Sequence, residues 1–274
     1  MLSMVKRMLP SGSFDAIRQF ARLSKDVSLE HKILWNVFSH SAYGYGLLHA
    51  CIQARKLGIE EVSALELGVA GGNGLVALER FAQLVEKATD VKVRTFGFDT
   101  GSGLPPPADY RDMPYFFRGE DFGMDVQRLR ARLQGTELIL GDVVETIPRF
   151  LERHGLPPIA FIGFDLDYYH PTRAVLDALA KCPDELTLPR PFLYFDNTVG
   201  LPDTLYNEFT GELLAIDEFN RAEPDMKIAR DRSLDRHAVR FLWYQKMYVL
   251  HRFTHETYTR YIGSPSSGKL ALTR

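Results

Sequence analysis

The chain has 274 residues, of which 45% are hydrophobic and 25% are charged, and its formal net charge is −2. This composition is that of an ordinary folded protein, and so small a charge gives no reason to expect nucleic acid or an acidic membrane surface as a partner. With only two cysteines, Cys51 and Cys182, we expect no disulfide framework and a reducing cytoplasm as the setting. No apolar run is long enough for a bilayer, and the run after Lys6 and Arg7 is too short for a signal peptide.

Helical patterns fill the first sixty residues. Apolar residues at helical spacing predict helices at 13–25, 29–38 and 45–57, and Gly58 is a suitable C-cap for the third. These helices could cover a substrate cavity or pack against a partner subunit in a homodimer, and the sequence leaves both open. We treat residues 1–60 as an N-terminal helical cap.

Strand and helix patterns alternate from residue 62 onward. We expect strands at 62–67, 92–98, 136–140, 159–165 and 191–196, with helices at 74–88, 123–134, 143–154 and 171–181. Short continuous apolar runs are typical of parallel strands covered on both faces, and right-handed crossovers then give a doubly wound α/β sheet.

The end of the chain completes this sheet. A helix is predicted at 204–220, followed by two strands at 226–230 and 246–253, which we expect to be antiparallel at one edge. The result is a mostly parallel, seven-stranded, Rossmann-like domain at 61–262, and the remaining residues, 263–274, are expected to be a disordered tail.

One connection is unusually long. Thr100 to Phe122 follows the second strand, shows no clear periodicity and contains three consecutive prolines. Such a length favours a functional loop over a tolerated surface insertion.

A glycine-rich turn follows the first strand. It reads Glu66-Leu-Gly-Val-Ala-Gly-Gly-Asn-Gly74 and leads into an amphipathic helix. Glycines let the backbone approach a ligand, and a helix N-terminus offers free N–H groups. Glu66 and Asp99 end neighbouring strands, and two carboxylates suit ribose hydroxyls better than phosphates.

Acidic residues also end the other strands. Asp142 follows the third strand, Asp165 the fourth and Asp196 the fifth, and Asp142 could equally be a helix N-cap. We expect Asp165 and Asp196 to converge, joined by Asn197 and by Asp167. Carboxylate and amide oxygens are ligands that suit Mg²⁺, and without a cation such close carboxylates would raise one another's pKa values. A hydrogen-bonded polar cluster is the alternative.

The motifs resemble those of class I S-adenosylmethionine-dependent methyltransferases. More narrowly, Phe98-Asp-Thr-Gly-Ser-Gly-Leu-Pro105 and Asp165-Leu-Asp-Tyr-Tyr-His-Pro-Thr172 resemble motifs of the macrocin O-methyltransferase family, and the resemblance covers residues 62–220. That family usually has Asp-Asp-Tyr after the fifth strand, whereas Asp196-Asn197 is similar to the metal-binding Asp-Asn of catechol and caffeoyl-CoA O-methyltransferases. Both groups of enzymes use a divalent metal, so the metal is still expected. The difference after the fifth strand leaves the substrate class open between the two groups.

The resemblance implies a role for each site residue. It implies a cofactor, S-adenosylmethionine, bound by Glu66, Gly68, Gly72, Asp99, Thr100 and Asp142. It also implies Mg²⁺ or another divalent cation on Asp165, Asp196 and Asn197, with Asp167 as the general base. The expected reaction is methylation of a hydroxyl on a small molecule or natural product, such as a sugar or a catechol. His170 is a second candidate for the base, and the other readings are a nicotinamide-dependent oxidoreductase and a non-catalytic protein that binds the cofactor.

Overall fold

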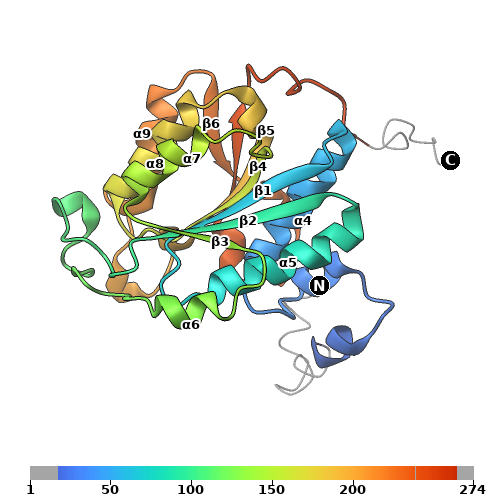
Figure 1. Ribbon diagram of the computed structural model, residues 1–274, viewed down its shortest axis with the longest axis horizontal. Coiled ribbons are helices and arrows are strands. Elements are labelled where there is room, and N and C mark those ends of the chain that lie inside the picture. The colour runs from blue at the N-terminus through green and yellow to red at the C-terminus, as the bar shows by residue number, and fades with distance from the viewer. Residues whose placement is uncertain (1–17, 238, 264–274) are drawn as a thin grey trace.

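A single seven-stranded sheet forms the centre of the protein (Figure 1). The computed structural model describes residues 18–237 and 239–263. The strands are β1 (Glu61–Leu67), β2 (Lys92–Asp99), β3 (Glu137–Leu140), β4 (Ile159–Phe164), β5 (Thr187–Phe195), β6 (Met226–Arg230) and β7 (Met247–Arg252), in the order β3-β2-β1-β4-β5-β7-β6. Neighbours among β1–β5 pair in parallel, whereas β7 is antiparallel to both β5 and β6. The predicted doubly wound α/β sheet is confirmed.

Helices cover both faces of this sheet. The helices are α3 (Leu29–Leu34), α4 (Ser41–Leu57), α5 (Asn73–Thr89), α6 (Val126–Arg130), α7 (Val143–Leu151), α8 (Tyr169–Lys181) and α9 (Gly211–Ala222). Helices α4 and α5 lie on one face, and α7, α8 and α9 lie on the other (Figure 1). Residues 18–23, within the first helix expected from the sequence, are also helical. Short 3₁₀ turns are η1 (Tyr110–Asp112), η2 (Asp184–Leu186), η3 (Asp196–Thr198), η4 (Pro202–Thr204), η5 (Arg232–Arg236) and η6 (Leu242–Gln245).

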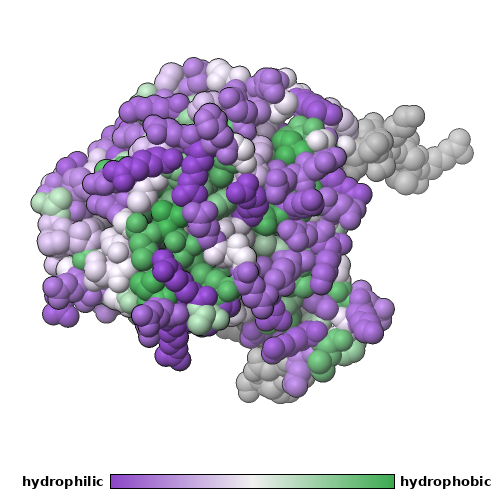
Figure 2. Space-filling view, viewed as in Figure 1, coloured by the Kyte–Doolittle hydropathy of each residue, from purple (hydrophilic) through white to green (hydrophobic). Residues whose placement is uncertain are grey.

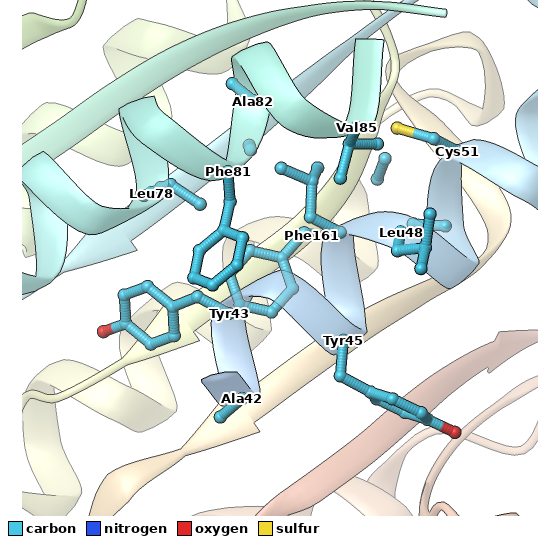
Figure 3. Packing of buried hydrophobic residues seen from close by; sticks show 14 of the residues in the cluster. Ala42, Tyr43, Tyr45, Leu48, Cys51, Leu78, Phe81, Ala82, Val85 and Phe161 are labelled. Atoms are coloured by element: carbon cyan, nitrogen blue, oxygen red, sulfur yellow. The ribbon is translucent and has the colours of Figure 1, made fainter. Parts of the chain in front are cut away.

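Two glycines let helix α4 pack closely against its neighbours, one against helix α5 and one against the sheet. A Cβ atom at Gly44 would lie 2.4 Å from the ring of Phe81 on α5, and one at Gly46 would lie 2.5 Å from the ring of Phe161 on β4. The rings of Tyr43 and Phe161 are 5.5 Å apart, and Figure 3 shows both beside Phe81 in this part of the core. Helix α4, expected as part of an N-terminal cap, is therefore one of the layers of the sheet domain.

Several predicted helices are too long, and for three of them the structure shows a feature at the end concerned. The helix predicted at 123–134 is only α6, because the chain beyond it turns to bring the backbone N–H groups of Gln134, Gly135 and Thr136 onto the carboxylate of Glu79. The helix predicted at 204–220 begins at Gly211, because Leu205 has a left-handed backbone. The helix predicted at 29–38 ends at Leu34, and Asn36 is left-handed.

The last two strands lie together at one side of the sheet and pair antiparallel, as predicted. Strand β7 lies inside the sheet between β5 and β6, so only β6 forms that edge. Strand β3 forms the opposite edge, and on the face drawn in Figure 2 hydrophobic residues gather in the middle, near the place of β3 in Figure 1.

The tail predicted as disordered lies almost wholly outside the described residues. Of the helices within the described part, none has the length and apolar character to cross a membrane.

Candidate functional site

A cavity lies at the carboxyl ends of the strands. It has a volume of about 370 Å³ and lies where the strand order reverses between β1 and β4, the usual ligand position in such sheets. Its lining includes most of the site residues expected from the sequence: Gly68, Asp99, Thr100, Asp142, Asp165, Asp167, Asp196 and Asn197. Glu66 and Gly72 instead line a smaller neighbouring cavity of about 280 Å³, which shares Asp165 and Asp196 with the first. Glu66 and Asp99, which the sequence paired, thus border different cavities, although the charge of Asp99 is close enough to help raise the pKa of Glu66.

The glycine turn is held by Asp99. One carboxylate oxygen of Asp99 accepts the backbone N–H groups of Val69 and Ala70 at 2.8 and 2.9 Å, and the other accepts from Gly101 at 2.6 Å. Gly68 has a φ of +82°, and a Cβ there would lie 1.8 Å from the backbone oxygen of Asp165. The turn after β1 therefore packs directly on the turn after β4. This contact brings Gly68 and Asp99 to the same cavity as Asp165.

Gly68→Ala should lower the free energy of unfolding by about 2–4 kcal/mol. The alanine would have to adopt a left-handed backbone, and its Cβ would clash with the backbone of Asp165. Gly71 in the same turn is the matched control, since a Cβ there meets nothing within 4 Å. Gly71→Ala should change stability by less than about 0.5 kcal/mol. Urea unfolding of the two variants checks this; equal destabilisation would contradict it.

Glu66 is buried between α4 and the glycine turn. The hydroxyl of Tyr43 donates to its Oε1 at 2.8 Å, while its Oε2 is buried with no hydrogen-bond partner among the described atoms. Burial raises the pKa of Glu66 to about 8. A Cβ on Gly74 would lie 1.9 Å from Oε1, so the first turn of α5 must pass over this carboxyl group.

The buried Glu66 predicts a pH dependence of folding. Its pKa is about 8 in the folded chain and 4.5 when unperturbed, so between these values the folded state holds a proton that the unfolded state has lost. Stability should therefore fall as pH rises, by about 1.4 kcal/mol per pH unit between pH 5 and 7. Glu66→Gln, which has no such proton, should lose this part of the slope. Urea unfolding at several pH values compares the two, and parallel curves would contradict the assignment.

Asp165 and Asp196 meet as the sequence predicted. Phe164 pairs with Phe195 in register, so Asp165 and Asp196 are the next residues of adjacent strands. Burial, and then the charges of Asp196 and Asp167, raise the pKa of Asp165 well above its usual value. Loss of hydration and the repulsion of neighbouring carboxylates both act in this direction.

Asp167 and Asn197 lie in contact beside them. Asn197 donates an amide N–H to Asp167 Oδ1 at 2.7 Å, which leaves Asn197 Oδ1 buried and without a partner in the described part of the chain. Burial raises the pKa of Asp167 to about 7. Asp167 also has a φ of +60°, a left-handed backbone that is uncommon outside glycine and is often found at functional sites.

The donor chemistry of this corner suits a hard divalent cation. Asp165 and Asp196 offer carboxylate oxygens, and the unpartnered Asn197 Oδ1 offers a neutral one. Among the described residues, no group of three or more His, Cys, Asp or Glu side chains is placed to hold a metal ion. A metal on this chain would therefore depend on the amide oxygen as its third protein ligand.

Lys246 and Tyr194 are site residues that sequence reasoning missed. Both donate to Asp196 Oδ1, Lys246 Nζ at 2.9 Å and the Tyr194 hydroxyl at 2.6 Å. Glu212, fully buried on α9, accepts the backbone N–H of Asn197 at 2.8 Å. Lys246 and Glu212 reach the site only through the folding of β7 and α9, so no local motif marked them.

Asp142 and Thr100 have structural contacts as well as places in the cavity. Asp142 caps α7 by accepting the backbone N–H of Val144 at 2.9 Å, the alternative that the sequence left open. The hydroxyl of Thr100 donates to the carbonyl of Gly103 at 2.7 Å, closing the start of the long loop.

The long loop from Thr100 to Phe122 forms one wall of the cavity, which supports its prediction as a functional loop. Asp112 is almost fully buried and pairs with His170 Nδ1 at 2.9 Å, which fastens the loop to α8. His170 does not line the cavity, so it is not placed to act as a base there.

No protein-family model and no curated protein sequence matches the chain, whereas solved structures resemble it. It is 20% identical to CalS11, a calicheamicin methyltransferase, over 89% of this chain and 92% of that one, with a TM-score of 0.51. It is 16% identical to the MycE methyltransferase of the mycinamycin biosynthetic pathway, solved with Mg and SAH (S-adenosylhomocysteine), over 74% of this chain and 48% of that one (TM-score 0.39). With the plantazolicin methyltransferase BamL the identity is 10% over 88% and 96% of the two chains (TM-score 0.41). At such identities the likeness concerns the fold, and the match to CalS11 along nearly the whole chain shows that this protein has the Rossmann-like fold of class I methyltransferases.

Proposed function

We propose that this protein is an S-adenosylmethionine-dependent O-methyltransferase that acts on a hydroxyl of a small molecule and uses a divalent cation. One observation carries the proposal: a single cavity joins the glycine turn and Asp99 to Asp165, Asp167, Asp196 and Asn197. A methyl donor on the first group and a hydroxyl on the second would share one cavity, as an in-line displacement requires. The CalS11 fold supports this choice of donor.

The glycine turn and Asp99 are assigned to the methyl donor. Because the carboxylate of Asp99 already accepts three backbone N–H groups, its position and orientation are fixed before a ligand arrives. A ribose hydroxyl would donate to the one acceptor site that these bonds leave, on Oδ1. Thr100 and Asp142 border the same end of the cavity, and Glu66 with Gly72 borders the neighbouring one.

Asp167 is assigned as the general base. It lines the cavity, and the amide of Asn197 fixes one of its oxygens, which leaves the other free to face an acceptor hydroxyl. Asp167 would take the hydroxyl proton as the acceptor oxygen bonds to the methyl carbon and the sulfonium sulfur leaves with the bonding pair.

Asp165, Asp196 and Asn197 are assigned to the cation. Bound there, a divalent ion would supply positive charge to the acceptor oxygen and lower the pKa of its hydroxyl. Lys246 and Tyr194 both occupy the same oxygen of Asp196, so its Oδ2 is left for the ion.

Titration calorimetry followed by a transfer assay tests the proposal. The protein should bind S-adenosylmethionine and S-adenosylhomocysteine, and it should not bind NAD⁺ or NADP⁺. It should then transfer a labelled methyl group to a member of a panel of sugars, catechols and phenols, lose this activity in EDTA and regain it with Mg²⁺. Binding of NAD⁺ alone would favour an oxidoreductase, and cofactor binding without transfer to any acceptor would favour a non-catalytic protein.

A further inference from the structure

A buried lysine lies beside the corner that we assign to the cation. Lys246 directly precedes β7, and its side chain is 10% exposed. The backbone N–H of Phe195 donates to the carbonyl of Lys246 at 2.9 Å, so this lysine lies at the end of β5, next to Asp196. Its Nζ pairs with Asp196 Oδ1 at 2.9 Å, and among the described residues no other acid that lines the two cavities is paired with a lysine or an arginine.

Both acceptor positions on one oxygen of Asp196 are filled. Lys246 Nζ donates to Oδ1, and the hydroxyl of Tyr194 donates to the same atom at 2.6 Å. The ring of Tyr194 packs against that of Tyr43, with their centroids 5.5 Å apart, which helps to fix the direction of its hydroxyl. Since a carboxylate oxygen has two lone pairs, these two bonds saturate Oδ1, and Asp196 is left with Oδ2 alone for a cation.

The neighbouring amide supports a cation at this corner independently of the acids. Asn197 is 5% exposed and lines the same cavity as Asp196, and its Oδ1 is buried without a hydrogen-bond partner among the described atoms. A buried carbonyl oxygen without a donor is costly, and a bound cation would satisfy it. Asp196 Oδ2 and Asn197 Oδ1 would therefore each give the ion one oxygen.

The restriction of Asp196 to one oxygen favours a small ion. Mg²⁺ takes six oxygens in nearly ideal octahedral geometry and keeps several waters, whereas Ca²⁺ takes up to eight and often binds both oxygens of a carboxylate. Occupation of Oδ1 therefore costs Ca²⁺ a ligand and costs Mg²⁺ none. The charge of Lys246 acts on both ions alike, because it repels any cation that binds Asp196.

We propose that Lys246 determines which cation the site takes: together with Tyr194 it holds Asp196 to one free oxygen, which disfavours Ca²⁺ relative to Mg²⁺. This inference rests on the divalent cation of the proposed function. Lys246 lines neither cavity and acts through Asp196, so it is a positioning residue and not a catalytic one. The two donors differ in one respect, because the hydroxyl of Tyr194 only occupies a lone pair, whereas the ammonium of Lys246 also adds charge.

Calorimetric titration of the full chain with Mg²⁺ and with Ca²⁺, with and without S-adenosylhomocysteine, tests this inference. Tyr194→Phe keeps the charge and frees one lone pair of Oδ1, so the affinity for Ca²⁺ should rise about fivefold relative to that for Mg²⁺. Lys246→Met also removes the charge, so the affinity for both ions should rise by about tenfold, with the same relative shift toward Ca²⁺. A lysine that only stabilised the fold would give the opposite sign, because a looser site binds either ion less tightly.

The matched controls are Lys181→Met and Tyr244→Phe. Lys181 is exposed at the end of α8, and Tyr244 on η6 donates its hydroxyl to the carbonyl of Leu34. Neither residue lines a cavity, so both variants should bind the two ions as the parent does. Circular dichroism of each variant shows whether it is folded, and Tyr194→Phe alone decides the selectivity if Lys246→Met does not fold.

The outcomes separate this inference from the proposed function. A ratio of Mg²⁺ to Ca²⁺ affinity that stays the same in Tyr194→Phe and Lys246→Met, or weaker binding of both ions by a folded Lys246→Met, would overturn the inference and leave the proposed function standing. A parent chain that binds neither ion would overturn the inference together with the cation of the proposed function.

Discussion

Asp167→Asn should lower the rate of methyl transfer by about 10²- to 10⁴-fold, the range usual for loss of a general base. Asparagine has nearly the same shape and tolerates the left-handed backbone that Asp167 adopts, so the fold should persist. Affinity for S-adenosylhomocysteine, measured by calorimetry, should stay within about twofold of the parent. The loss should therefore fall on kcat and not on cofactor binding.

Asp217→Asn is the matched control for this substitution. Asp217 lies on α9, pairs with the exposed Arg221 and is absent from the lining of both cavities. Its variant should keep the activity of the parent. If Asp167→Asn retains more than about a tenth of that activity, another group accepts the proton and the assignment of the base is wrong.

Asp165→Ala should abolish metal-dependent transfer while cofactor binding survives. Removing it leaves Asp196 and the Asn197 amide as the only assigned protein ligands, and loss of an outer partner alone usually costs 10- to 100-fold in metal affinity. We therefore expect Mg²⁺ binding, followed by calorimetry, to weaken by more than about 100-fold.

The control for this second variant is Asp177→Ala, which removes a carboxylate of α8 that is paired with Arg173 and lies outside both cavities. It should bind Mg²⁺ and S-adenosylhomocysteine as the parent does. Unchanged Mg²⁺ affinity in Asp165→Ala would remove the metal from this corner, and loss of S-adenosylhomocysteine binding would show that Asp165 belongs to the cofactor half.

The strand ends were predictable from the sequence, for a physical reason. Parallel strands bring their carboxyl ends to one edge, so an acid after each apolar run identified Asp99, Asp165 and Asp196 without any tertiary information. The glycines of the turn after β1 were also predictable, because they follow directly on an apolar run.

The ends of helices were harder to predict. The end of α6, for example, depends on Glu79, a side chain of another helix.

The partners of these acids could not be found from local patterns. Tyr43 is 23 residues before Glu66 and meets it through the close packing of α4, in which Gly44 leaves room for Phe81 and Gly46 for Phe161. Lys246 is 50 residues after Asp196 and directly precedes β7, which pairs with β5. A local pattern identifies the groups at a strand end, and the packing of distant elements sets their charge and orientation.

The packing of α4 also has a consequence for folding during synthesis, because this helix contacts residues that are synthesised much later. Gln53 on α4 donates to the carbonyl of Arg190, 137 residues later, and Tyr45 donates to Asp231, 186 residues later. Helix α4 leaves the ribosome early, but it can form these contacts only after the strands that carry them have been synthesised, near the end of translation. Until β5 and β7 emerge, the apolar face of α4 lacks part of its native cover, so a chain stopped before Lys246 would expose this face to chaperones and proteases.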